Sequence, residues 1–196
     1  MNIFILDHDP VKAAQLLCDK HAAGKMAVES AQMLSTAHRM LDGYIERRPS
    51  KSGKRTVNHY IHPDPDMDAV LYKAVHFHHP CTVWTMESRA NYRWHFTHFI
   101  ALCNEFTHRY GKTHLADTKL RRVLAQYPQN IPNRKQTPFK LAMASNPECI
   151  ALGDPVKAYR AFYQTKQDRF TMAWTKREKP EWFVYNDSKE LVNEVL

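Results

Sequence analysis

The chain has 196 residues, a length typical of one domain with a single hydrophobic core. Hydrophobic residues make up 43% of it and charged residues 24%, which excludes disordered and low-complexity proteins. Lysine and arginine outnumber aspartate and glutamate by 28 to 20, and this excess favours a polyanionic partner such as DNA. We therefore predict one compact domain over residues 1–196 with DNA as its partner, and the helical patterns along the chain, taken in order below, predict a mainly α protein.

Several classes of protein are excluded by what the sequence lacks. With only 5 glycines it has no GxxxxGK[ST] or GxGxxG loop for phosphates or dinucleotides. The first apolar stretch, Ile3 to Leu6, ends at Asp7 and is too short for a signal peptide or a membrane span. The 4 cysteines form no CxxC pair, so neither a zinc ribbon nor a disulfide framework is predicted. We expect a cytoplasmic protein without membrane contact or cofactor, and its oligomeric state is left open.

The N-terminal third contains one well-defined helix and one basic segment. Met1–Asp7 is predicted to be extended, and Asp9-Pro10 has the residues that begin a helix. Between Lys25 and Leu41 apolar residues recur at helical spacing until Asp42-Gly43, which predicts an amphipathic helix. Residues 44–65 are predicted to be an exposed basic loop, because their centre has five basic residues and almost nothing apolar.

The central helix of the fold is predicted just before Gly111. Apolar side chains recur there at steps of four and three, and the glycine fits a helix C-cap. Further helices are expected from Asp66 to Val75, over 114–126 and from Asp154 to about Lys166, where aromatic and basic residues share one face. Residues 174–185 are a candidate for a small hairpin. The apolar stripe of the central helix consists of Tyr92, Phe96, Phe99, Cys103, Phe106 and Tyr110.

A first polar column would lie beside the apolar arc of the 25–41 helix if that helix continues back through Gly24. Helical geometry then aligns His21, Lys25 and Glu29, followed by Gln32 and Thr36. The column offers an acid, a base and an anion-binding cation, but such residues are also typical of any solvated helix face. Lys25 precedes Glu29, which is the less favourable order for an ion pair that stabilises a helix.

A second polar face is predicted on the central helix, opposite its apolar stripe. A tryptophan among polar groups indicates either a helix buried on both sides or a cleft in which the ring stacks on a base. Glu105 and Arg109 also have the favourable order for an exposed ion pair. We expect this face to share one cleft with the first column. Its residues are Asn91, Trp94, His98, Glu105 and Arg109, with Lys112 and His114 just beyond the helix.

The 12 histidines are candidate metal ligands. His95/His98 and Glu105/His108 are i,i+3 pairs, but a di-metal bundle site needs two Glu-x-x-His motifs and two further glutamates. The motifs of zinc deaminases are also missing, and the histidines at 76–79 lie at a predicted helix end, where they favour the helix dipole. We predict no metal site.

Basic residues gather in three clusters that are separated by aromatic-rich helices. This arrangement resembles phosphate contacts on either side of a base-handling pocket, although basic loops occur on many proteins that never touch DNA. The clusters comprise Arg47, Arg48, Lys51, Lys54 and Arg55; Lys119, Arg121 and Arg122; and Arg134, Lys135 and Lys140.

The opening of the chain resembles a family of small proteins encoded by tailed bacteriophages. The resemblance rests on Leu6-Asp7-His8-Asp9-Pro10, Cys18-Asp19-Lys20-His21, Lys25-Met26 and Glu29-Ser30-Ala31-Gln32. It continues through His79-Pro80, Trp84, Ser88, Asn91, Trp94, Glu105, Arg109, Gly111-Lys112, His114, Pro138-Phe139, Ala142-Met143 and Tyr159-Arg160. In that family two apolar residues separate Lys-His from Lys-Met, whereas Ala22-Ala23-Gly24 stands here.

The resemblance implies a phage setting, with host cytoplasm as the location, and gives no catalytic assignments. The best-fitting class of phage enzyme performs thymidine hypermodification, in which an amino acid amine displaces pyrophosphate from an activated 5-hydroxymethyluracil in DNA. That reaction needs a pocket for an extruded base, cations for pyrophosphate and a group that deprotonates the amine.

Roles for individual residues follow from this hypothesis of a DNA base-modifying transferase with a free amino acid as co-substrate. His21 or Glu29 would take the proton, with Glu105 as a further catalytic candidate. Trp94 would stack on the base and Asn91 would read its edge. The phosphate-binding candidates are Lys20, Lys25, Arg109, Lys112 and His114.

Two alternatives remain open. A pyrimidine-specific DNA glycosylase/lyase would attack the sugar with an amine, and a desolvated lysine such as Lys20 or Lys25 would serve. A non-enzymatic DNA-binding or host-takeover protein would have solvated polar columns, no pocket, and an affinity that falls steeply with salt.

Overall fold

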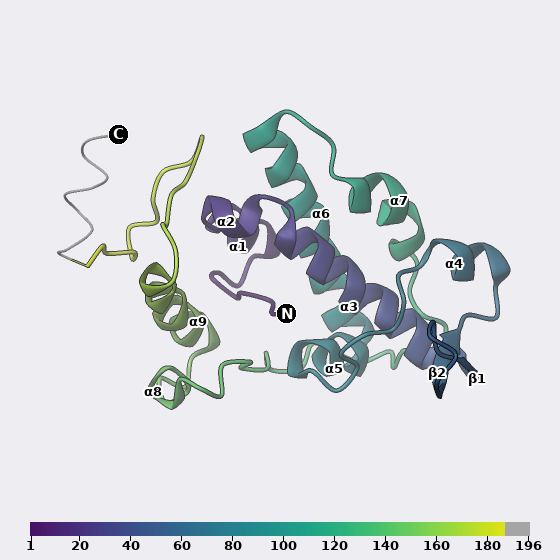
Figure 1. The fold of residues 1–196 in the computed structure, drawn as a ribbon. Helices are drawn as coiled ribbons and strands as arrows, with labels where there is room; N and C mark the ends of the chain where they lie inside the picture. The colour runs from purple at the N-terminus through teal and green to yellow at the C-terminus, as the bar shows by residue number, and fades with distance from the viewer. Residues whose placement is uncertain (187–196) are drawn as a thin grey trace.

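The structure is a computed structural model that describes residues 1–186; residues 187–196, the end of the predicted domain, lie outside the described part. Helices dominate it, and within residues 1–186 the strands are β1 and β2 (Figure 1). The prediction of a mainly α fold is confirmed. No helix in this part of the chain is long and apolar enough to cross a membrane.

Three helices follow the extended N-terminal segment. In α1 (Pro10–Gln15) the carboxylate of Asp9 accepts hydrogen bonds from the amides of Val11 and Lys12, as expected of an N-cap. Gly24 separates α2 (Asp19–Ala22) from α3 (Lys25–Leu41), so the helix does not run unbroken. Position 24 requires glycine for two reasons. The φ of Gly24 is +99°, and a Cβ there would lie 2.7 Å from the ring of His114.

The centre of the fold consists of α3, α5 (Pro80–Glu87) and α6 (Arg89–Tyr110), which contact one another. Gly111 ends α6 with a φ of +66°, which is the C-cap predicted from the sequence. The short α4 (Pro65–Val70) ends before Val75, and α7 (Leu115–Leu124) follows α6. Residues of α6 are buried on the apolar stripe and also opposite to it, so the helix is enclosed on both sides.

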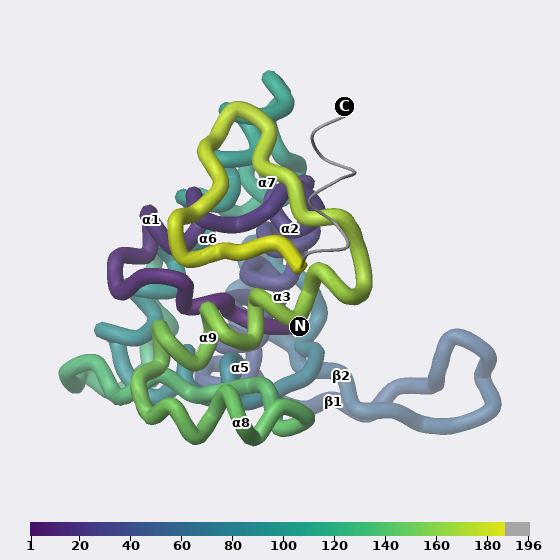
Figure 2. The backbone as a smooth tube through the Cα atoms, turned by 90° about the vertical axis from the view of Figure 1, so that its left-hand side faces the viewer, coloured from purple at the N-terminus to yellow at the C-terminus, as the bar shows by residue number. Residues whose placement is uncertain are grey.

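The basic segment at 44–65 is a hairpin rather than a loop. β1 (Tyr44–Pro49) pairs antiparallel with β2 (Thr56–Ile61), from Tyr44 opposite Ile61 to Pro49 opposite Thr56. Figure 2 shows the hairpin projecting from the body of the molecule. Tyr44 and Ile45 are 54% and 56% exposed. Strands could not be predicted here because a projecting ribbon has no buried face that requires apolar and polar residues to alternate.

The chain ends in α8 (Pro147–Ile150), α9 (Pro155–Gln164) and the 3-10 helix η1 (Thr165–Asp168). The segment 174–185 contains turns and no strand, so the candidate hairpin is not formed. Its aromatic residues nevertheless pack inward: Phe183 is fully buried against Trp174.

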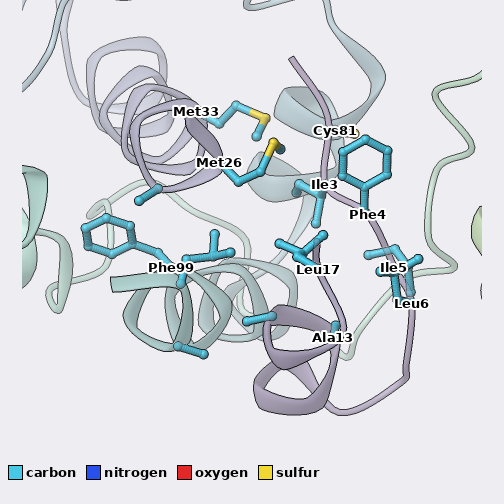
Figure 3. Close-up of a cluster of buried hydrophobic side chains, with 14 of the residues drawn as sticks. Ile3, Phe4, Ile5, Leu6, Ala13, Leu17, Met26, Met33, Cys81 and Phe99 are labelled. Atoms are coloured by element: carbon cyan, nitrogen blue, oxygen red, sulfur yellow. The ribbon is translucent and has the colours of Figure 1, made fainter. Parts of the chain in front are cut away.

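The N-terminal segment lies in the middle of the hydrophobic core. Figure 3 shows Ile3, Phe4, Ile5 and Leu6 threading between α1, α3 and α5, and each is at most 5% exposed. Burial of one such side chain stabilises a fold by about 1.5–3 kcal/mol. The segment also brings residues 1 and 2 to the start of α3, where the candidate site lies.

Candidate functional site

A pocket of about 510 Å³ lies where the N-terminal segment, the α2–α3 junction and η1 meet. Its ionisable side chains are four cations, one carboxylate and one imidazole, the amide of Asn2 is a further polar group, and half of the apolar residues are aromatic. The ionisable set is Lys20, His21, Lys25, Glu29, Lys166 and Arg169, and the aromatic set is Phe4, Phe162 and Phe170.

The pocket brings together the first half of the predicted polar column. His21 lies on α2, and Lys25 and Glu29 lie on α3. Although Gly24 breaks the helix, these three side chains still line one hollow. The rest of the column does not reach it, because the Thr36 hydroxyl donates to the carbonyl of Gln32 and accepts from the amide of Val75.

Glu29 is the one carboxylate of the pocket. Its side chain is 15% exposed, and its Oε2 accepts a hydrogen bond of 3.1 Å from the amide of Asn2. The Met1 α-amino nitrogen lies 3.7 Å from Oε2, and Lys25 Nζ lies 4.0 Å from Oε1. The carboxylate is thus held in place at the pocket wall.

His21 is held on the pocket wall as a neutral imidazole. Its Nδ1 lies 2.7 Å from the Tyr163 hydroxyl, and its ring packs on Phe4 at 4.7 Å between centroids. Burial, together with the smaller effect of the nearby charges of Lys25, Lys166 and Lys20, lowers the pKa of His21 to about 3. A histidine with so low a pKa is a weak proton acceptor.

Lys166 belongs to this site and was missed as a site residue from the sequence. Its residue is only 8% exposed, and Nζ lies 3.5 Å from the ring centroid of Phe162. Burial is the main cause of its lowered pKa, and Arg169 and Lys25 lower it further. The signal available in the sequence was the aromatic and basic face at the end of the 154–166 helix, which gave no indication of the tertiary partner.

The second polar face is largely buried and does not reach this pocket. Asn91 is fully buried, and its Nδ2 donates to the carbonyl of Trp84 and to Thr137 Oγ1, each at 2.7 Å. Trp94 Nε1 donates to the carbonyl of His8 at 2.8 Å. Both side chains therefore connect α6 to segments distant in sequence, and neither is placed to bind a base.

Glu105 and Arg109 form a buried network instead of an exposed ion pair. Arg109 Nε donates to Glu105 Oε1 at 2.7 Å, and one terminal nitrogen donates to Asp19 Oδ1 at 2.8 Å. Arg177 donates to both oxygens of Glu105 at 2.9 and 2.8 Å. Glu105 is 3% exposed, so its carboxylate is fully engaged in joining α6 to the C-terminal segment.

The remaining predicted phosphate ligands lie outside the pocket. Lys112 is exposed after the end of α6, and His114 Nδ1 accepts from the amide of Ala116 as the N-cap of α7. The expectation that both polar faces share one cleft is therefore wrong. Of the predicted set, the pocket contains Lys20, His21, Lys25 and Glu29.

Of the histidines considered as metal ligands, His95 and His98 are buried in the core and hydrogen-bonded there. His95 contacts the hydroxyls of Thr85 and Ser30 at 2.7 and 3.1 Å, and His98 Nδ1 donates to the carbonyl of Pro10. With Glu105 engaged by arginines, neither i,i+3 pair presents a free pair of ligand atoms.

The basic clusters differ in how many of their side chains form ion pairs with carboxylates. In the hairpin the side chains other than Arg48, which pairs with Glu46, extend into solvent. Arg121 pairs with Asp117 and Lys140 with Glu87. Exposed basic residues without an ion pair within residues 1–186 include Arg47, Lys51, Lys54, Arg55, Lys119, Arg122, Arg134 and Lys135.

A comparison of the chain with protein-family models, with curated proteins and with solved structures found no match.

Proposed function

We propose that the protein is a DNA base-modifying transferase whose pocket receives an extruded thymine derivative bearing pyrophosphate. The observation that carries the proposal is the pocket itself, where four cations and one carboxylate face an aromatic wall. Cations stabilise a leaving pyrophosphate, and aromatic rings stack on bases without regard to their edges. A hollow of about 510 Å³ has the size of a small-molecule site.

Each group has a role in the displacement. The amine of a free amino acid forms a bond to the exocyclic methylene carbon of the activated base, and the bond from that carbon to the pyrophosphate oxygen breaks. Lys20, Lys25 and Arg169 neutralise the departing pyrophosphate, and Glu29 takes the proton that the amine loses. Neutral His21 contributes a hydrogen bond rather than a charge.

The hairpin supports a role in holding DNA. A two-stranded ribbon fits the major groove of B-DNA, and exposed basic side chains neutralise phosphates. Helix α3 begins at the pocket and ends beside the hairpin, and its 17 residues span about 25 Å, or roughly seven base pairs. One duplex can therefore contact the hairpin while a flipped base occupies the pocket.

The same proposal places the protein in a phage-infected cell, with modified phage DNA in the host cytoplasm as its substrate. The resemblance to tailed-phage proteins supports this setting.

The direct test is to incubate the purified chain with duplex DNA that carries the pyrophosphorylated 5-hydroxymethyluracil and with a mixture of amino acids. Mass spectrometry of the digested nucleosides is expected to reveal an amino acid adduct of thymidine, together with released pyrophosphate. Unchanged nucleosides, under conditions in which the DNA is bound, would contradict the transferase.

One observation favours a second enzyme, the DNA glycosylase/lyase. The buried Lys166 has a lowered pKa, and a desolvated lysine is an effective amine nucleophile. In this reaction the amine attacks the sugar C1′ and the glycosidic bond breaks. After the ring opens, an imine joins the lysine to the DNA.

Borohydride separates the two reactions because it reduces only the imine. The lyase predicts a trapped protein–DNA adduct that is lost in Lys166→Met and retained in the exposed control Lys157→Met. The transferase predicts no adduct with either chain.

A further inference from the structure

Three side chains of types that can ligate a metal lie close together at the C-terminal end of α3, the end away from the pocket. His38 lies in the last turn of the helix, Asp42 is its C-cap, and His62 follows β2. One ligand atom from each lies within 4.8 Å of the other two. His38 and His62 are 1% and 6% exposed, so this is a buried cluster and not a chance group of surface side chains.

The hydrogen bonds around His38 fix which of its nitrogens is free. The Tyr92 hydroxyl donates to the carbonyl of Leu124 at 3.0 Å, so its oxygen accepts from Nε2 of His38 at 2.8 Å. With the ring proton on Nε2, the lone pair lies on Nδ1, which is buried and has no hydrogen-bond partner. Metal-bound histidines show this same arrangement, in which the second ring nitrogen donates to a polar partner.

His62 contributes a second ring nitrogen without a hydrogen-bond partner to the same cluster. Its Nε2 is buried without a hydrogen bond and lies 3.9 Å from Asp42 Oδ2. That separation is too long for a hydrogen bond, but it is close to the spacing of about 3.4 Å between two ligands of one tetrahedral zinc ion. When a metal ion binds to Nε2 of His62, the ring proton must move from Nε2 to Nδ1. The 3.2 Å hydrogen bond that Nδ1 accepts from the amide of Asp64 is then lost.

The carboxylate of Asp42 is oriented by the loop that follows α7. Its Oδ2 accepts from the amide of Gln129 at 2.7 Å, and its Oδ1 accepts from the amide of Asn130 at 2.9 Å. These contacts hold the oxygens in place, as the outer partners of ligating carboxylates do. Beside the cluster lies a hollow of about 410 Å³, which leaves room for a water as a further ligand.

We propose that His38, Asp42 and His62 bind one divalent transition-metal ion of the zinc class. Two imidazoles and one carboxylate with an open position suit such an ion better than calcium or magnesium, which take oxygen ligands. The site joins α3, the base of the hairpin and the loop after α7, so the ion stabilises the attachment of the hairpin. This inference stands independently of the proposed function.

The test uses the full chain after removal of metals with a chelator. The chain is incubated with excess zinc chloride and desalted, and the bound zinc is measured by mass spectrometry. We expect about one zinc per chain, together with a rise in Tm and visible ligand-field bands when cobalt(II) replaces zinc. His62→Gln is expected to lower the bound metal at least fivefold and to abolish the cobalt bands.

The control is His78→Gln, which changes an exposed histidine of the 76–79 cluster and is expected to retain the zinc. If His62→Gln fails to fold, Asp42→Asn serves, and the wild-type cobalt spectrum still decides whether a histidine-containing site exists. The proposal is overturned if the wild-type chain retains no stoichiometric zinc, or if His78→Gln loses the metal while His62→Gln keeps it.

Discussion

Lowering the pH from 7.5 to 5.0 is expected to reduce the free energy of unfolding by about 8 kcal/mol. Four histidines are buried in the native protein, and burial lowers their pKa values. The pKa of His21 is about 3 and those of His38 and His98 are about 4, while that of His95 is well below its usual value. All four therefore stay neutral in the fold near pH 5.

The sign follows from where protons bind. In the unfolded chain a histidine has a pKa of about 6.5, so below that value the unfolded state takes up protons that the native state does not. Each such histidine stabilises the unfolded state by about 2 kcal/mol at pH 5. The loss begins as the pH falls through about 6.5 and continues towards the native pKa values. Because whole domains are stable by only about 5–15 kcal/mol, this loss is a large fraction of the total stability.

Urea unfolding at a series of pH values, at constant ionic strength and with a chelator present, measures this effect. The slope near pH 5 is expected to correspond to about four protons taken up on unfolding. His98→Gln should reduce that uptake by about one, whereas the exposed control His78→Gln should not reduce it by as much. A stability that stays flat between pH 7 and 5 would mean that these histidines are not buried as neutral groups.

Replacement of Glu29 by Gln is expected to lower kcat/KM of the transferase by about 100-fold or more, because the pocket loses its proton acceptor. Gln retains an oxygen that can accept from the amide of Asn2, so the fold should change little. The measurement is the rate of amino acid adduct formation, with unfolding in urea as the check on stability.

The matched control is Glu181→Gln, which removes an exposed carboxylate outside the pocket. It is expected to leave the rate unchanged. If Glu29→Gln remained fully active, the proton would have to go elsewhere, and the assignment of roles in the pocket would be wrong.

Much of the helical scaffold could be predicted from local pattern. The apolar periodicity of α3 and α6 and the glycine C-cap at Gly111 depend on neighbours three or four residues away, which the sequence displays directly. For Met1–Asp7 the sequence predicts an extended segment, but not its place in the middle of the core, which depends on distant helices. The hairpin could not be predicted, since its exposed strands lack an apolar face.

The polar face of α6 was misjudged because its partners lie far along the chain. Trp94 bonds to the carbonyl of His8, Asn91 to Thr137, and Glu105 to Arg177. The position of a polar residue on a helix face is the same whether the residue lines a cleft or is buried against a partner far along the chain. Helical spacing alone therefore does not distinguish the two cases. Lys166 shows the opposite case, since tertiary packing placed it in a pocket that its local pattern did not indicate.

The His38, Asp42 and His62 cluster was missed for a related reason. His38 and Asp42 are four residues apart and face the same way, but the third ligand comes from beyond the hairpin. Only the folding of β1 and β2 returns the chain to the end of α3.

The central claim is that the pocket at the start of α3 seats the pyrophosphate-bearing base. The most direct measurement is the affinity of the chain for two duplexes of one sequence, with and without a single pyrophosphorylated 5-hydroxymethyluracil. The wild-type chain is expected to prefer the modified duplex, and the double variant with Lys25→Met and Arg169→Met is expected to lose the preference while still binding the plain duplex. Equal, steeply salt-dependent affinity of the wild-type chain for both duplexes would contradict the claim and leave a non-enzymatic DNA-binding protein.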